Sequence, residues 1–119
     1  MELEEFKKRL AEIEDKNIIT SKHAFKRIQD VKRKITYDKI LDLLTSQKGL
    51  YRVEEQKAMN DNEIKCKLWF KLNDFYDMNV YTALKKEIKE ESLNSLVIIS
   101  AHKVKRKIQD KLRKNKNEN

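Results

Sequence analysis

The spacing of apolar residues changes along this chain from a helical period to a strict alternation, and this change constrains its fold more than any other feature. In the first segment, the apolar residues three or four positions apart are Leu3, Phe6, Leu10 and Ile13. Such spacing lines one face of a helix, which we expect over residues 2–15. From residue 50 onward apolar and polar residues alternate instead, as in a strand buried on one side. The pattern therefore predicts the α+β class, with helices before a sheet.

Two further helices are predicted before the period changes. After a short extended piece at residues 17–20, Thr20 or Ser21 can cap a helix, because its side-chain oxygen accepts a hydrogen bond from a free amide of the first turn. The apolar side of that helix comprises Ala24, Phe25, Ile28, Val31 and Ile35. The next helix begins at Thr36 and ends at Gly49, the only glycine in the chain. The two helices would form a hairpin.

About four strands are predicted in the second half of the chain. Their ranges are residues 50–55, 64–72, 78–85 and 96–100. Asn73 and Asp74 supply the turn between the second and the third strand. The last strand is apolar on both sides, which favours a central position in the sheet. The polar residues 86–95 before it are expected to form a surface loop.

A chain of 119 residues has room for one domain. We expect an N-terminal helix in residues 1–16, a core in residues 17–102, and a basic helix and tail in residues 103–119. In that last segment the apolar residues four positions apart are Val104, Ile108 and Leu112. The N-terminal helices would pack on a twisted antiparallel sheet of about four strands. The first helix would cover the sheet or, alternatively, serve as a docking element.

The distribution of charge favours a polyanionic partner. The net charge is +8, and lysines and arginines that face phosphates gain affinity by releasing counterions. Codon bias of an A/T-rich genome would also enrich lysine. The asymmetry is harder to explain in that way: residues 1–15 carry six acidic and three basic side chains, whereas residues 103–119 carry eight basic and two acidic ones. We therefore predict a nucleic-acid partner.

Several classes of site are disfavoured by the composition. A phosphate-cradling loop needs closely spaced glycines, and the chain has one. Cys66, His23 and His102 are too few for a zinc-ligand set, so no metal or cofactor is expected. The longest aliphatic run, residues 96–99, is far too short to span a bilayer, and the N-terminus is acidic where a signal peptide would be basic. We expect a cytoplasmic protein without a membrane partner.

The predicted strand at residues 64–72 carries an aromatic residue among lysines on its polar face. Aromatic rings that stack on bases and cations that hold phosphates are what a single-stranded RNA platform requires. The residues predicted to form this platform are Lys65, Lys67, Trp69 and Lys71, with Tyr81 on the next strand. The alternative is that a terminal helix covers Trp69. The cations predicted to add phosphate contacts near the C-terminus are Lys105, Arg106, Lys107 and Lys111.

The two histidines are candidates for proton transfer. Cleavage of RNA by its own 2′-hydroxyl needs one group to accept that proton and another to protonate the leaving oxygen, and histidine can do either near neutral pH. His23 precedes Arg27 by one helical turn, and His102 ends the last predicted strand, beside Lys103. Nearby cations would stabilise charge on the phosphoryl oxygens. Surface or capping histidines without a catalytic role are the alternative.

Two short segments resemble a family of toxin-related proteins. Residues 20–28, TSKHAFKRI, followed by Lys34-Ile35-Thr36, are similar to the opening helix of an uncharacterised RelE-like family, with its histidine–alanine pair and later arginine. Residues 98–103, IISAHK, after three strands, are similar to that family's terminal strand. The resemblance covers roughly residues 17–109. Its matched positions are His23, Ala24, Arg27 and Ser100, and His102 is an addition.

The resemblance implies a helical hairpin packed on a twisted antiparallel sheet, as in RelE and ParE toxins. It also implies metal-independent cleavage of RNA, free or on the ribosome, restrained by an antitoxin protein. The candidate catalytic residues are then His23, Arg27, Ser100, His102 and Lys103. Two alternatives stay open: a non-catalytic nucleic-acid-binding module, and a protein-interaction domain derived from an inactive toxin that uses the apolar stripe of its first helix.

Overall fold

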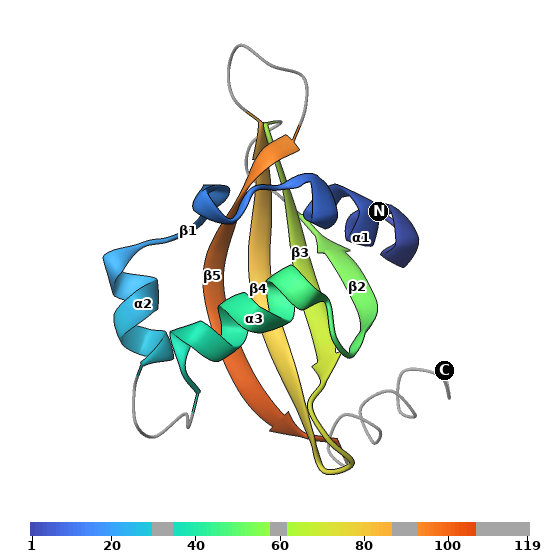
Figure 1. The fold of residues 1–119 in the computed structure, drawn as a ribbon, viewed down its shortest axis with the longest axis vertical. Coiled ribbons are helices and arrows are strands. Elements are labelled where there is room, and N and C mark those ends of the chain that lie inside the picture. The colour runs from blue at the N-terminus through green and yellow to red at the C-terminus, as the bar shows by residue number, and fades with distance from the viewer. Residues whose placement is uncertain (30–34, 58–61, 87–92, 107–119) are drawn as a thin grey trace.

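The computed structural model describes residues 1–29, 35–57, 62–86 and 93–106, and these ranges form an α+β fold (Figure 1). The helices are α1 (Leu3–Glu12), the short 3₁₀ helix η1 (Asp15–Asn17), α2 (Lys22–Ile28) and α3 (Tyr37–Ser46). The strands are β1 (Ile18–Thr20), β2 (Leu50–Gln56), β3 (Glu63–Lys71), β4 (Tyr76–Lys86) and β5 (Leu93–Lys105). In these ranges we find no helix with the length and apolar composition needed to cross a membrane.

The described strands form one mixed sheet in the order β1-β5-β4-β3-β2. The last four strands make antiparallel pairs, whereas β1 runs parallel to β5, with Ile18 beside Leu96 and Thr20 beside Ile98. The four predicted strands are present as β2 to β5 and pair antiparallel, but the prediction missed β1 as a fifth strand, which makes the sheet mixed. The sequence indicated an extended piece at residues 17–20, but its pairing partner is β5, 78 positions further along the chain. A local sequence pattern carries no information about pairing between such distant segments.

The last strand is the element that differs most from its prediction. It runs from Leu93 to Lys105 rather than over residues 96–100, because the long strand β4 pairs with it along nearly its whole length, up to Tyr76 beside Lys105. Of the predicted loop of residues 86–95, residues 86 and 93–95 are strand, and the others lie outside the described residues. A basic helix does not begin at residue 103, since residues 103–105 are strand. From residue 107 onward that predicted helix, with Lys107 and Lys111, lies outside the described residues.

The helices α2 and α3 begin where the capping residues predicted, but both are shorter than predicted. The Ser21 hydroxyl accepts a hydrogen bond from the Ala24 amide at 3.0 Å, and the Thr36 hydroxyl accepts one from the Lys39 amide at 3.2 Å. Because α2 ends at Ile28, the predicted apolar side is cut short: Ile35 is buried but lies outside the helix, and Val31 is not in the described ranges.

Two further predictions about the helices were wrong. The Phe25 side chain is 40% exposed and contacts the Tyr37 ring at 5.2 Å between centroids, so it does not point into the core. The third helix ends at Ser46, where Gln47 adopts the left-handed conformation, and not at Gly49. Gly49 is instead required by the turn into β2, because its φ is 81° and a Cβ there would lie 2.4 Å from the Lys71 carbonyl oxygen.

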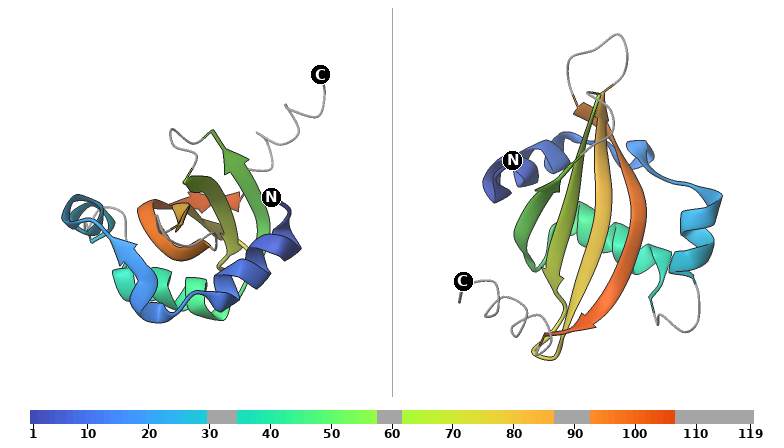
Figure 2. Two further views of the ribbon diagram at one scale, coloured as in Figure 1. Left: turned by 90° about the horizontal axis from the view of Figure 1, so that it is seen from above. Right: turned by 180° about the vertical axis from the view of Figure 1, so that it is seen from behind.

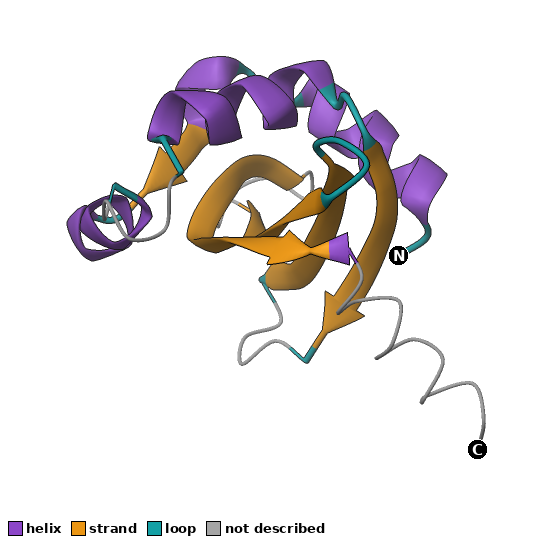
Figure 3. Ribbon diagram, turned by 90° about the horizontal axis from the view of Figure 1, so that it is seen from below, coloured by secondary structure: helices purple, strands orange, loops and turns teal. Residues whose placement is uncertain are grey.

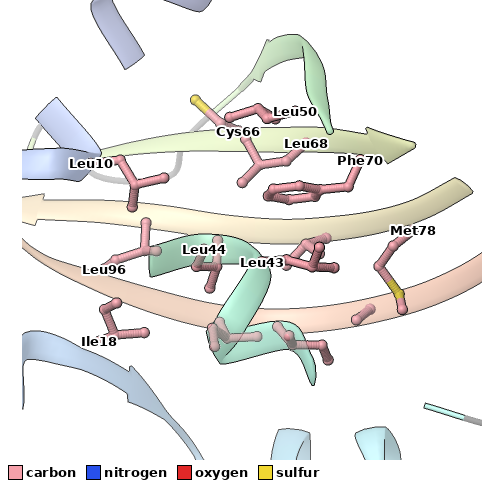
Figure 4. Packing of buried hydrophobic residues seen from close by; sticks show 14 of the residues in the cluster. Leu10, Ile18, Leu43, Leu44, Leu50, Cys66, Leu68, Phe70, Met78 and Leu96 are labelled. Carbon is pink, nitrogen blue, oxygen red and sulfur yellow. The ribbon is translucent and has the colours of Figure 1, made fainter. Parts of the chain in front are cut away.

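The hydrophobic core lies between the helices and one face of the sheet (Figures 1 and 3). Phe6, Leu10 and Ile13 belong to this cluster, so the first helix covers the sheet as expected. Figure 4 shows side chains of α1 and α3 packing against the strands; those labelled include Leu10, Leu43, Leu44, Leu68, Phe70 and Leu96. Seen from behind, the strands are not crossed by a described helix (Figure 2). We call this second face the open face.

Candidate nucleic-acid interface

The open face carries polar, aromatic and cationic side chains in two neighbouring rows. Strand register places Arg52 of β2 beside Trp69 of β3, Trp69 beside Asn79 of β4, and Asn79 beside His102 of β5. These four residues form the first row. The second row lies two residues further along each strand and consists of Glu54, Lys67, Tyr81 and Ser100. Residues two apart in a strand point to the same face, so the two rows adjoin.

Cations and rings alternate across these rows. The Arg52 guanidinium carbon lies 4.6 Å from the centre of the Trp69 ring, and the Lys67 Nζ lies 4.5 Å from the same ring. The Lys67 Nζ is also 5.4 Å from the centre of the Tyr81 ring. The Tyr81 and His102 rings make an edge-to-face contact, with 6.1 Å between their centroids. These cations and rings come from both rows, and we call the set the cation–ring row: Arg52, Trp69, Lys67, Tyr81 and His102. Each such cation–ring contact contributes about 0.5–2 kcal/mol, most where water is excluded.

Trp69 lies on the predicted face but does not offer an open ring. It is only 6% exposed, and the cations Arg52 and Lys67 lie over it. Two of the groups that contact the Trp69 ring come from β2 and β3. The first helix packs on the other face of the sheet, and the last predicted helix, from residue 107 onward, lies outside the described residues. Arg52 and Lys67 are themselves half-buried, and both place their charged groups over the Trp69 ring.

The other predicted nucleic-acid contacts are distributed over the sheet. Lys65 is half-buried on the open face, whereas Lys71 is exposed and forms an ion pair with Asp74 at 3.5 Å. Lys105 is exposed at the end of β5. The half-buried Tyr81 lies beside Lys67, as predicted for the returning strand.

Arg106 has a structural partner in this fold. Its guanidinium pairs with the carboxylate of Asp77, which is fully buried and also accepts a hydrogen bond from the Tyr51 hydroxyl. The Arg106 guanidinium lies 5.8 Å from the centre of the Tyr51 ring. This buried cluster joins β2, β4 and the residue after β5. Arg52, Tyr51 and Asp77 were not among the predicted residues. Their contacts depend on how distant strands pair, and the sequence alone does not determine that register.

The candidate catalytic residues of β5 separate onto two sides of the sheet. His102 is exposed on the open face, in the interior of the strand and not at its end as predicted. Ser100 lies on the same face, two positions away and in register with Tyr81. Lys103 points to the other side, with its Nζ 4.4 Å from the centre of the Tyr76 ring. Ser100, His102 and Tyr81 are thus brought together, and Lys103 is not part of that group.

The other two candidate catalytic residues lie on α2. His23 and Arg27 are exposed and one turn apart. The buried residues of this helix are Ala24 and Ile28, and Ile28 belongs to the core that lies on the far side of β5 from His102. The neighbour of His102 in β5, Ala101, faces that core. The structure therefore places the two histidines in different surroundings, both outside the core.

Two further observations concern the cysteine and the metal-ligating residue types. Burial, together with the charge of Glu55, raises the pKa of the Cys66 thiol to about 11, so the thiol stays protonated at neutral pH. Within the part of the chain that the structure describes, no group of three or more histidine, cysteine, aspartate or glutamate residues is arranged to hold a metal ion.

Comparison with known proteins finds no match to this chain, whether among protein-family models, curated proteins or solved structures.

Proposed function

We propose that this protein binds single-stranded RNA on the open face of its sheet. The observation that carries the proposal is the cation–ring row. Contacts with Trp69 and Tyr81 restrain Lys67, so less side-chain entropy is lost when this cation meets a phosphate. Arg52 is restrained by Trp69 in the same way, and its planar guanidinium suits the oxygens of a phosphate group.

Two other features favour RNA as the polyanion. His102 is exposed and Tyr81 is half-buried, and aromatic side chains of both kinds stack on unpaired bases. The net charge of +8 supplies a long-range attraction for any polyphosphate. Glu54 also lies on this face, beside Lys67, and a carboxylate in that position opposes tight, indiscriminate binding of phosphate. A flexible single strand can route its phosphates around it.

The test compares two lysines with the same charge. Lys67→Ala removes a cation from the row, whereas Lys39→Ala removes an exposed cation from α3, on the other side of the sheet. We expect Lys67→Ala to weaken binding of a single-stranded oligouridylate about fivefold or more and to lower the salt slope by about one. Lys39→Ala should change neither quantity appreciably. Equal effects of the two substitutions in a fluorescence-anisotropy titration would mean that only net charge matters and that the row is no site.

A second candidate function is metal-independent cleavage of RNA. It is favoured by the grouping of His102 with Tyr81 and Ser100, close to the cation Lys67. An imidazole in that position can exchange a proton with the 2′-hydroxyl or the leaving oxygen, and Lys67 can stabilise the phosphoryl charge. The RelE-like resemblance points to the same reaction and adds His23, Arg27 and Lys103 to the candidates, together with a restraining antitoxin.

The cleavage hypothesis makes separate predictions for the two histidines. If His102 transfers a proton, His102→Ala should lower the rate of cleavage by about 10²–10⁴. If His23 shares the reaction, His23→Ala should do the same, and if it does not, cleavage should be unchanged. The measurement is the appearance of 2′,3′-cyclic phosphate or 3′-phosphate ends on cellular RNA or translating ribosomes in the presence of chelator. Wild-type protein that cuts neither substrate would leave RNA binding without catalysis.

A further inference from the structure

The hairpin between β3 and β4 carries an apolar side chain that the fold does not account for. Phe75 is 75% exposed, and among the described residues it is the most exposed large apolar side chain, ahead of Ile19, Phe25 and Ile99 at 40–49%. Tight turns favour glycine, asparagine, aspartate, serine or proline, and nothing in this turn requires a phenylalanine. The residue therefore contributes little to the folded state at this position.

The turn holds Phe75 in a defined place. The side-chain oxygen of Asn73 accepts hydrogen bonds from the amides of Phe75 and Tyr76, at 2.8 and 2.9 Å. The Tyr76 carbonyl accepts one from the Leu72 amide at 3.0 Å. In addition, the Arg106 amide donates to the Phe75 carbonyl at 2.9 Å, which ties the tip to the end of β5. An exposed ring on a fixed turn binds a flat partner with little loss of conformational entropy.

Cations surround this tip. Lys105 is in register with Tyr76, and the Nζ of Lys103 lies 4.4 Å from the centre of the Tyr76 ring. Both lysines are exposed. The nearby carboxylate of Asp74 forms an ion pair with Lys71. Described residues that line a hollow of about 500 Å³ at this end of the molecule are Asp74, Phe75, Tyr76 and Lys105.

We propose that the tip is a second contact for single-stranded RNA, in which Phe75 stacks on an unpaired base and Lys103 and Lys105 bind the adjacent phosphates. The inference rests on the proposed function and extends it. Asn79, which lies between Trp69 and His102 on the open face, is four positions from Phe75, or about 13 Å along an extended strand. Because Lys103 lies on the other side of the sheet from His102, an RNA strand that makes both contacts passes around the end of the β3–β4 hairpin.

The experiment separates stacking from apolar contact by varying residue 75. Affinity for oligouridylate and oligoadenylate is measured for the wild type and for Phe75→Tyr, Phe75→Leu and Phe75→Ala, with Ile19→Ala as the control at an exposed apolar residue of β1. Because Phe75 is exposed, all three variants should fold normally. We expect Phe75→Leu and Phe75→Ala to lose about fivefold to a hundredfold in affinity, as for other base-stacking aromatics. Phe75→Tyr should bind like the wild type, and Ile19→Ala should have no effect.

The outcomes distinguish this inference from the proposed function. If the wild type binds RNA and Lys67→Ala weakens it, but Phe75→Leu and Phe75→Ala bind normally, the tip is no contact while the open face remains one. If Phe75→Leu binds as well as the wild type and only Phe75→Ala is weak, the contact is apolar and the stacking inference fails. Vesicles of phosphatidylserine and phosphatidylcholine are the other arm: Phe75-dependent binding to them, without any effect on RNA, would overturn the inference in favour of a lipid surface. A wild type that binds neither oligonucleotide removes both proposals.

Discussion

At the scale of single residues, burial decides what Trp69 and Lys67 can do. A tryptophan among lysines on the polar face of a strand is typical of a base-stacking platform, but Trp69 is only 6% exposed and two cations lie over its ring. In the proposed function a ligand contacts Arg52 and Lys67, and Trp69 contributes by restraining these two side chains. Replacing Trp69 would disturb packing as well as binding, which makes Lys67 the more informative position for mutation.

Cys66 provides a pH prediction at the same scale. The pKa of its thiol is raised to about 11 in the folded protein, from a reference value of 9.0. Between these values the unfolded chain loses the thiol proton and the folded protein keeps it, so raising the pH favours unfolding. The stability contributed by the protonated thiol is complete below pH 9 and declines by roughly 2–3 kcal/mol as the pH approaches 11.

The measurement is the free energy of unfolding in urea from pH 7 to 10.5 for the wild type and for Cys66→Ala. Lysines and tyrosines titrate in the same window in both proteins, so the difference between their slopes isolates the thiol. The variant should lose less stability as the pH rises. Parallel slopes, or rapid alkylation of native Cys66 at pH 8, would contradict the raised pKa.

At the scale of elements, β5 and the buried cluster around Asp77 hold the sheet together. Strand β5 pairs with β1 on one side and with β4 on the other, and Arg106 directly after it reaches back to Asp77 in β4. Tyr51 donates to the same carboxylate from the edge strand β2. Because Asp77 is fully buried, a charge on its carboxylate depends on such hydrogen-bonding and ionic partners.

Removing that carboxylate should therefore be costly. We expect Asp77→Ala to lower the free energy of unfolding by about 3 kcal/mol, since it leaves Arg106 and Tyr51 without their buried acceptor. Asp74→Ala is the matched control, because Asp74 also forms an ion pair but is almost fully exposed, and its loss should cost less than about 0.5 kcal/mol. Urea denaturation of both variants provides the comparison, and equal costs would show that the cluster does not stabilise the fold.

At the scale of the whole molecule, the two faces of the sheet differ in what packs against them. The helices cover one face and form the core with it (Figures 2 and 3). Strand register places the cation–ring row on the open face. The acidic N-terminal segment belongs to the helical side, where Glu4 and Glu5 of α1 are exposed. The helical side also carries exposed cations, among them Lys26 and Arg27 of α2 and Lys39 of α3. The net charge of +8 therefore attracts a polyanion to the molecule as a whole.

Local sequence determined much of this fold, because secondary structure and capping depend on neighbouring residues. The change from helical to alternating spacing predicted the α+β class and the strands β2, β3 and β4 to within a few residues. The hydroxyls of Ser21 and Thr36 marked the starts of α2 and α3. The side of β3 on which Trp69 and Lys67 lie also followed from the alternation alone, since the period of a strand is two.

Tertiary structure alone decided the rest, because pairing between distant segments sets what each side chain contacts. Strand β1 pairs in parallel with β5, although the two are far apart in sequence. Strand β5 extends through residues 103–105 because it pairs with β4 there. The register of β2 against β3 brings Arg52 over Trp69 and so converts a predicted stacking ring into a support for cations. The same long-range pairing places His102 beside Tyr81 on the open face and Lys103 on the other side. A pattern with a period of two assigns a residue to a face, but only the folded sheet determines which residue is its neighbour.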